Sequence, residues 1–387
     1  MNLSGKKLVK ITSISTNYFQ LLRKLITFND FLILTQVEIW YMAENIDLGG
    51  FIISLDFELH WGVRDKRSPQ EYKENLLGAR EAIPKILDLF QKYNISATWG
   101  VVGFLFARNQ KELNKIKDSL PIPSYSNSIY TPFQQKVGHN EKEDPFHYAP
   151  SLIKLIKNQP KQEIASHTTS HFYTLEEGQT AEEFDSDIKK SIEIANSRNI
   201  NIHSIIYPRN QHNPNYSKIL QSNGITSFRG NPGHEVYSGS TNKQKNKLSK
   251  RLIRLLDSYF NILGHKTTKW EDLIYDKNLL NIRASSFLRP YSNRLGFLEK
   301  RKINRIRTSM TYAAQNNELY HLYWHPHNFG SNIEQNIKNL TEILKHFRYL
   351  NQKFNFRSLS MFETSKLYHQ YFSIYKCFAP TGPVLQF

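Results

Sequence analysis

The chain has 387 residues, of which 39% are hydrophobic, and its formal net charge is +17. This length and composition exclude an intrinsically disordered chain and allow one large hydrophobic core or two modest ones. The single cysteine, Cys377, excludes a disulfide framework within the chain. We therefore expect a reducing compartment and a cytoplasmic protein. No run of about 18 to 20 apolar residues occurs, so we predict no transmembrane helix.

The basic excess has two interpretations. Much of it lies between residues 243 and 307, where Lys and Arg far outnumber Asp and Glu. A solvated, lysine-rich surface is the simpler interpretation, because the composition is biased toward Lys, Asn and Ile. The alternative is contact with an anionic glycan, a lipid-linked sugar or the inner face of a membrane. Nucleic acid is not an expected partner, because no recognition motif accompanies the charge.

Residues 1–45 precede the first expected strand. They make a poor secretory signal, because they lack a long apolar region and a small-residue cleavage site. Three interpretations are an interfacial amphipathic helix, a packing arm and a mis-assigned start of translation. We favour the last, since Met42 stands shortly before the first strand and would be a natural initiator.

From Gly49 onward, short apolar runs alternate with segments that have apolar residues at helical spacing. In chain order we predict strands at 51–55, 96–103, 163–166, 203–207, 226–229, 319–324 and 356–360, and the alternation resumes at 281–288 after an interruption. We predict helices at 72–93, 150–157, 181–198 and 215–223, from 310 onward and at 333–350. Residues 107–148 are polar with several prolines, so we expect loops and short helices there.

Residues 234–280 interrupt this alternation. They are basic and contain Ser, Asn and Gly clusters, which indicates an insertion or a lid. The alternation elsewhere predicts an α/β fold with a mainly parallel sheet, most simply a (β/α) barrel. We place this barrel at residues 46–370 and a C-terminal tail at 371–387. Functional residues of such barrels gather at the carboxyl ends of the strands.

Carboxylates and imidazoles follow two of the expected strands. His167 and His171 are spaced i, i+4, so on a helical turn both imidazoles could grip one ion, unless they are surface or capping residues. Asp56 and Glu58 are spaced i, i+2, so on a strand both would point the same way. One carboxylate can complete a metal site and the other can serve as a base toward water. A pair of exposed acids is the alternative.

Two further residues stand at comparable positions. His325 follows the apolar run 322–324, and a histidine there can donate a proton to a leaving amine or alkoxide. His327 is its near rival, and either can instead be a structural histidine. Arg209, within the segment 207–211, can pair with a catalytic carboxylate and lower its pKa, or it can be a surface arginine.

Together these segments resemble the motifs of the polysaccharide deacetylase family, also called the NodB-homology family or carbohydrate esterase family 4. The first family motif, usually Thr-Phe-Asp-Asp-Gly, is similar to Ser-Leu-Asp-Phe-Glu at 54–58. The second, His-Ser/Thr-x-x-x-His or close to it, is matched at 167–171. Arg209 resembles the arginine of the third motif, and Tyr-Trp-His at 323–325 resembles the Leu-x-His of the fifth. The likeness covers roughly residues 49–365.

The resemblance implies a distorted (β/α) barrel of about seven strands, related to the TIM barrel, and a hydrolase that uses a divalent metal ion, for which we expect Zn²⁺. By this likeness Asp56 is the general base and His325 is the general acid. The metal ligands are Glu58, His167 and His171.

Two departures from the family pattern affect these assignments. Phe57 stands where the family's metal-binding Asp usually follows the base, so we assign that ligand to Glu58, as in a divergent Asp-x-Asp/Glu branch. The fourth motif, an Asp that orients the acid histidine, has no clear counterpart, so the partner of His325 is unassigned.

The implied activity is removal of an N-acetyl group from a sugar of a bacterial surface polysaccharide or its precursor. Phe-Arg-Gly-Asn at 228–231 and Arg-Ala-Ser at 283–285 resemble a subgroup often met in the biosynthesis of such polysaccharides. The expected partner is an acetylated sugar or glycan, anionic or lipid-linked. Two alternatives stay open: a hydrolase of another linear amide or an O-acetyl ester, and a carbohydrate-binding barrel without catalysis.

Overall fold

A computed structural model describes residues 48–237, 241 and 248–378. The chain divides into a unit at Leu48–Lys366 and a second unit made of Met1–Asp47 and Leu367–Phe387. The described part of the second unit is the continuation of helix α12, which spans Met361–Phe378. The predicted extension at 1–45, with Met42, lies outside the described residues.

The larger unit is built on one sheet of ten strands, nearly all of them parallel. The strands are β1 (Gly50–Phe57), β2 (Ala97–Val101), β3 (Gln162–Ser166), β4 (Ser204–Ile206), β5 (Ser227–Arg229), β6 (Ile274–Asp276), β7 (Leu279–Asn281), β8 (Ser286–Phe287), β9 (Leu319–Trp324) and β10 (Arg357–Leu359). Only β6, paired with β7, is antiparallel to its neighbour among the named strands. This parallel arrangement is the one that the alternation of the sequence predicts.

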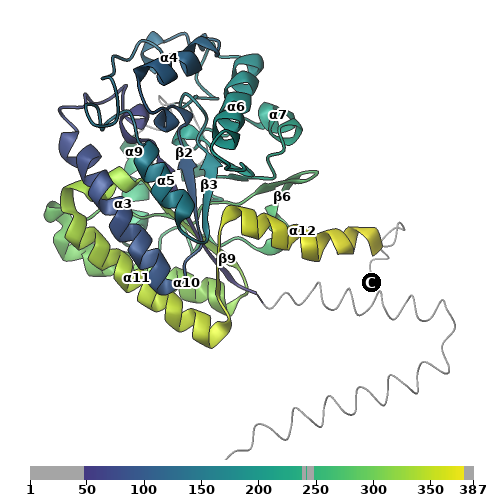
Figure 1. The fold of residues 1–387 in the computed structure, drawn as a ribbon. Coiled ribbons are helices and arrows are strands. Elements are labelled where there is room, and N and C mark those ends of the chain that lie inside the picture. The colour runs from purple at the N-terminus through teal and green to yellow at the C-terminus, as the bar shows by residue number, and fades with distance from the viewer. Residues whose placement is uncertain (1–47, 238–240, 242–247, 379–387) are drawn as a thin grey trace, which may run out of the picture. The chain divides into compact units, whose positions relative to one another are not determined.

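Nine α-helices of the described residues accompany the sheet. They are α3 (Lys73–Tyr93), α4 (Gln110–Asp118), α5 (Pro150–Asn158), α6 (Ala181–Asn196), α7 (Ser217–Ser222), α9 (Leu248–Asp257), α10 (Glu299–Gln315), α11 (Ile333–Phe354) and the start of α12. Figure 1 shows α3, α11 and α10 packed side by side on one flank. Within the described residues, none of the helices has the length and apolar character needed to span a bilayer.

The sheet curls into a barrel. Its strand order is β6-β7-β5-β4-β3-β2-β1-β9-β8, with β10 paired to β1. β7 and β8 belong to one extended segment: Ile282 N donates to Phe228 O of β5 at 2.9 Å, and Ser285 N donates to His321 O of β9 at 2.8 Å. This segment therefore bridges the two ends of the curl. The predicted α/β barrel is confirmed, and its circuit runs through β1, β2, β3, β4, β5, the β7–β8 segment and β9.

Apolar spacing predicts helix α3 well, but in helix α10 the same signal is obscured at the first turns. Leu76, Ile83 and Phe90 of α3 recur on one face and are fully buried. Helix α10 begins at Glu299, eleven residues before the predicted start at 310. Its first turns read Glu-Lys-Arg-Lys, and the charged residues hide an apolar face that includes Ile303.

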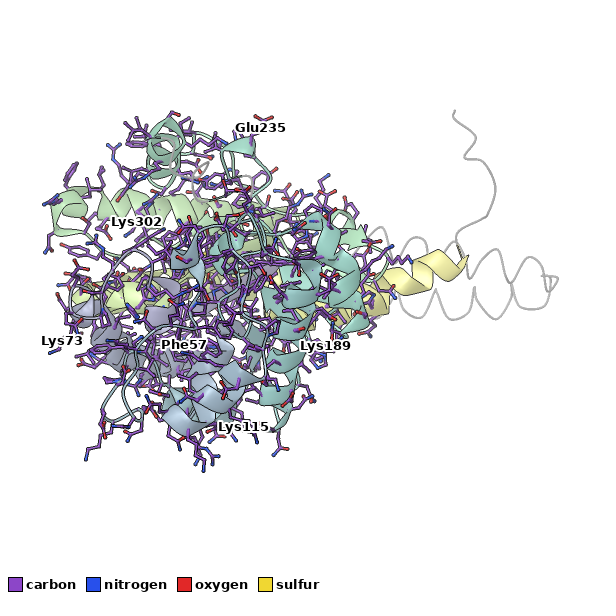
Figure 2. The ribbon with its side chains drawn as sticks, turned by 90° about the horizontal axis from the view of Figure 1, so that it is seen from above. Phe57, Lys73, Lys115, Lys189, Glu235 and Lys302 are labelled. Atoms are coloured by element: carbon purple, nitrogen blue, oxygen red, sulfur yellow. The ribbon has the colours of Figure 1, made fainter. Side chains whose placement is uncertain are left out.

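Surface lysines account for part of the net charge. Lys73, Lys115 and Lys189, from α3, α4 and α6, lie at the periphery in Figure 2 and are exposed. Phe57 of β1 lies in the interior and is 1% exposed. This distribution supports a solvated basic surface for these helices.

The amino ends of the strands are closed by the start of α12. The backbone nitrogen of Met361 donates to Thr98 Oγ1 at 2.8 Å, and that of Phe362 donates to Glu163 Oε2 at 2.9 Å. A carboxylate at a helix N-terminus is electrostatically favourable. The carboxyl ends of the strands are therefore the end of the barrel at which a site can open.

Helix α3 packs closely against η9 (Pro326–Asn332), the short helix that follows His325. A Cβ on Gly78 would overlap the backbone of Gly330. Gly78→Ala gains about 1 kcal/mol of helix propensity but costs about 1–3 kcal/mol or more in overpacking, so we expect a lower melting temperature. Gly233→Ala, which meets only an ordinary contact, is the matched control. Equal thermal unfolding of both variants and the unsubstituted protein would contradict this close packing.

Candidate active site

Side chains from four separate strands meet at the carboxyl end of the barrel. Asp56 lies near the end of β1, and Glu58 is the first residue after that strand. His167 follows β3, Arg229 ends β5, and His325 follows β9. These positions converge because the carboxyl ends of parallel strands share one end of the sheet.

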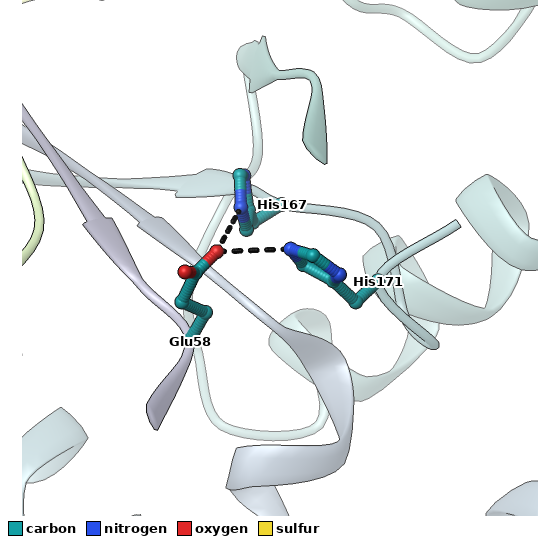
Figure 3. A group of neighbouring side chains, drawn as sticks. All are labelled: Glu58, His167 and His171. Carbon is teal, nitrogen blue, oxygen red and sulfur yellow. Dashed lines mark hydrogen bonds and ion pairs between the residues drawn. The ribbon is translucent and has the colours of Figure 1, made fainter. Parts of the chain in front are cut away.

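Three of these groups form a compact ligand set. Glu58 Oε2 lies 3.1 Å from His167 Nε2 and 2.9 Å from His171 Nε2 (Figure 3). One ligand atom from each side chain lies within 4.8 Å of the others, and all three side chains are buried. Burial lowers the pKa of His171 to about 3, so its imidazole is neutral, which is the form that binds a metal ion.

The hydrogen bond behind His167 shows that a cation fits this site. His167 Nδ1 lies 2.7 Å from the carbonyl oxygen of Ile206, which can only accept a hydrogen bond, so Nδ1 carries a proton. In the neutral form of the ring, which is the form that binds a metal ion, the lone pair of Nε2 is directed at Glu58 Oε2, 3.1 Å away. Two electron-rich atoms in this position are stabilised by a metal ion, and the carbonyl behind the ring is the usual orienting partner.

A loop, not a helical turn, brings the two histidines together. Thr168 and His171 have φ values of 60° and 57°, in the left-handed region. The Asp187 side chain of α6 holds the loop, accepting hydrogen bonds from the Ser170 backbone at 3.0 Å and from its hydroxyl. Burial raises the pKa of Asp187 to about 6, although these hydrogen bonds oppose the shift. The helical turn that we assumed for the i, i+4 spacing is therefore wrong.

Asp56 is 2% exposed and is held by Arg229. The Arg229 guanidinium meets both carboxylate oxygens, with Nη2 2.7 Å from Oδ2. It also donates to Asn210 Oδ1 at 2.6 Å and to Ser54 Oγ at 3.1 Å. Burial raises the pKa of Asp56, but the charge and hydrogen bonds of Arg229, together with the charges of His325 and His167, outweigh it and leave the pKa below its usual value. Asp56 is therefore ionised at neutral pH.

His325 faces both acids from the open side. Its Nε2 lies 3.5 Å from Asp56 Oδ2 and 3.7 Å from Glu58 Oε1, and its side chain is 26% exposed. The amide nitrogen of Asn328 lies 3.4 Å from His325 Nδ1, where the sequence offers no acid of the fourth motif. His327, the rival of His325, is buried, and burial lowers its pKa to about 4.

Arg209 lies in the same region but has a different partner from the one we anticipated. It forms an ion pair with Asp65, and its guanidinium carbon lies 4.4 Å from the centre of the Tyr173 ring. The arginine that pairs with Asp56 is instead Arg229, to which we assigned no role from the sequence. The sequence did carry a signal for Arg229. It lies at the end of the predicted strand 226–229, as the other candidate residues lie at the ends of their strands.

The site opens into a cavity of about 1070 Å³. Asp56, Glu58 and His325 are among its lining residues, and so is Arg209. Ligand pockets commonly have volumes of about 300–1,000 Å³, so this cavity has room for a sugar and further groups.

Comparison with known proteins shows what this chain is similar to. Residues 76–228 match the family model described as polysaccharide deacetylase. Among solved structures, the chain is similar to a candidate polysaccharide deacetylase from Mycobacterium smegmatis, with 11% identity and a TM-score of 0.52, over 83% of this chain and 91% of that one. A second, from Pseudomonas aeruginosa PAO1, has 10% identity and a TM-score of 0.49, over 84% and 91%. No curated protein matches the sequence.

The matched region includes His167, His171 and Arg209 but ends before His325. The likeness to the first solved structure supports the barrel fold. The predicted resemblance is therefore confirmed: residues 76–228 match the family model of the polysaccharide deacetylases.

Proposed function

We propose that this protein is a metal-dependent hydrolase that removes an N-acetyl group from a sugar of a surface polysaccharide or its precursor. The observation that carries the proposal is the buried set of Glu58, His167 and His171, beside Asp56 and His325. A divalent ion held there, for which two imidazoles and a carboxylate suit Zn²⁺, supplies Lewis-acid chemistry toward a water molecule and the acetyl carbonyl.

Two residues of the chain carry out the two proton transfers of this reaction. Asp56, kept ionised by Arg229, accepts a proton from the attacking water as its oxygen bonds to the acetyl carbon. His325, partly exposed at the cavity, donates a proton to the sugar nitrogen as the carbon–nitrogen bond breaks. The products are acetate and a free amino sugar. His325 lies within 3.5 Å of Asp56, so one substrate can reach both groups.

An acetate-release assay tests this function. The metal-free protein and the Zn²⁺-loaded protein are each given a panel of N-acetylated and O-acetylated sugars. We expect acetate and an equal amount of free amine from at least one N-acetylated sugar, and only with the metal. Acetate without amine would favour the O-acetyl esterase alternative. No acetate from any sugar, with retained glycan affinity, would favour the binding barrel.

Gly62 restricts where the Glu58 side chain can lie. A Cβ on Gly62 would overlap the Glu58 carboxyl group. Gly62→Ala should therefore displace this carboxylate and weaken Zn²⁺ binding about tenfold or more without removing any ligand. Zn²⁺ titration against a competing chelator measures the affinity, with Gly233→Ala as the matched control. Unchanged Zn²⁺ affinity in Gly62→Ala would argue against Glu58 as a ligand.

Arg229 sets the charge of Asp56. Arg229→Gln removes the attraction that lowers the pKa of Asp56, so this pKa rises. The acidic limb of the pH–rate profile should move to higher pH, and the rate at neutral pH should fall about 10- to 100-fold. Arg229→Lys keeps the positive charge and should recover part of the rate. An unshifted acidic limb in Arg229→Gln would contradict the pairing.

A further inference from the structure

The cavity is lined by more cations than its acids can neutralise. Four cations already have acidic partners: Arg209 with Asp65, Lys302 with Glu299, and both Lys266 and Arg305 with Asp257. Arg289, Arg251 and Lys66 also line the cavity. Among the described residues, no ion pair is found for these three.

Arg289 is the most enclosed of the three. Burial lowers its pKa, and the nearby charge of Arg254 adds to this effect. Tyrosines also lie near it, among them Tyr323, whose ring centre lies 4.3 Å from the guanidinium carbon of Arg229. Arg289 and Arg229 therefore share Tyr323 as a neighbour. A half-buried guanidinium without an acid is costly until an anion enters.

We propose that Arg289 binds an anionic group of the substrate, a phosphate or a carboxylate, with Arg251 and Lys66 as further cations of the same cavity. This assignment rests on the proposed hydrolase function and names its substrate class: an acetylated sugar that carries a negative charge. A guanidinium suits this task because its planar fork can donate two hydrogen bonds to one phosphate or carboxylate.

Two measurements test the anion site. Calorimetry with inorganic pyrophosphate should show binding that Arg289→Gln weakens at least tenfold and Arg289→Lys weakens less. With N-acetylglucosamine 1-phosphate, Arg289→Gln should raise KM about tenfold with little change in kcat, and turnover of a neutral N-acetylated sugar should not change. Arg357→Gln, an exposed arginine on β10, is the matched control.

The binding arm does not depend on turnover, so it separates this proposal from the hydrolase itself. Weaker pyrophosphate binding in Arg289→Gln supports the anion site even if no sugar is hydrolysed. Equal pyrophosphate affinity in Arg289→Gln and the unsubstituted protein, with both folded by thermal unfolding, overturns it. A KM increase that is the same for neutral and phosphorylated sugars also overturns it.

A second, independent observation concerns an exposed face of α9 and of the turn after it. Four apolar side chains recur every four residues, Leu248, Leu252, Leu256 and Phe260, with exposed fractions of 80%, 53%, 39% and 39%. Arg301 lies over the Phe260 ring, 5.4 Å from its centre, and thus connects this face with the start of α10. Phe297, one turn before Arg301, is 79% exposed. We call these five apolar residues the apolar ridge.

The charges beside the apolar ridge are of one sign. In Leu248–Asp257 and residues 293–301, the exposed charged residues are Arg251, Arg294, Lys300 and Arg301. The acids of these segments, Asp257 and Glu299, are buried and already paired. An exposed apolar stripe flanked by cations is typical of helices that lie in the interface of an anionic membrane.

We infer that the apolar ridge docks on the surface of an anionic phospholipid membrane. Charge complementarity favours this occupant, since Arg294, Lys300 and Arg301 would face anionic headgroups. Leu248 and Leu252 also line the cavity, so the ridge borders the site. Docking there would bring the cavity next to substrates that are anchored in lipid.

Co-sedimentation with vesicles tests this docking. The full chain should bind vesicles of phosphatidylglycerol and phosphatidylcholine, bind pure phosphatidylcholine much less, and dissociate as salt rises. Leu252→Asp combined with Phe297→Asp should reduce binding at least tenfold. Leu155→Asp, at a leucine of α5 that is 41% exposed, should not. Failure of the unsubstituted chain to bind, or equal binding by the double variant, overturns the proposal. Neither result depends on hydrolysis.

Discussion

Asp56→Asn is expected to lower acetate release about 10³-fold, with the bound metal retained. The amide has nearly the shape of the carboxylate but cannot accept the proton of the attacking water. Asp56 is not in the set of ligand atoms formed by Glu58, His167 and His171, so metal content should not change. Acetate release and elemental analysis on the same preparation measure both quantities.

The variant also leaves Arg229 buried without its anion, which costs stability. Circular dichroism and thermal unfolding must therefore accompany the assay, so that a lost fold is not mistaken for a lost base. Asp88→Asn, at an exposed acid of α3, is the matched control and should match the unsubstituted protein. Normal turnover by folded Asp56→Asn would remove Asp56 from the mechanism.

Glu58→Gln should lose both the metal and the activity. The carboxylate faces the Nε2 atoms of both histidines, and a neutral amide is a weaker ligand for a divalent cation. We expect Zn²⁺ content below about a tenth of that of the unsubstituted protein and acetate release at background.

Excess Zn²⁺ provides the control for this variant. If Glu58 acts only as a ligand, saturating Zn²⁺ should restore part of the acetate release, whereas Asp56→Asn should not respond. The contrast between the two variants separates metal binding from proton transfer. Full Zn²⁺ content in Glu58→Gln would show that another group completes the site.

The strand ends could be predicted because each carries its own local signal. An apolar run followed by an acid or a histidine marks the ends of β1, β3 and β9, and strand–helix alternation implies that they meet. No local signal in the sequence shows which side chains pair with one another. Asp56 pairs with Arg229, 173 residues away, and only the curl of the sheet from β1 to β5 brings them together.

The histidine pair shows the same limit in a shorter stretch. The i, i+4 spacing correctly suggests that two imidazoles meet, but a helix is only one way to achieve this. Here Asp187, on the following helix, accepts the Ser170 hydrogen bonds and fixes a loop with two left-handed residues. The basic region 234–280 was visible as a change of composition, yet its apolar ridge became visible only with the exposed fractions of α9.

The zinc content of the purified full-length chain tests the central claim most directly. Elemental analysis should find about one Zn²⁺ per chain in the unsubstituted protein and almost none when Glu58, His167 and His171 are all replaced by Ala. The triple variant should also lose acetate release. Equal Zn²⁺ in both proteins, or full acetate release by metal-free protein, would contradict the proposed metal centre.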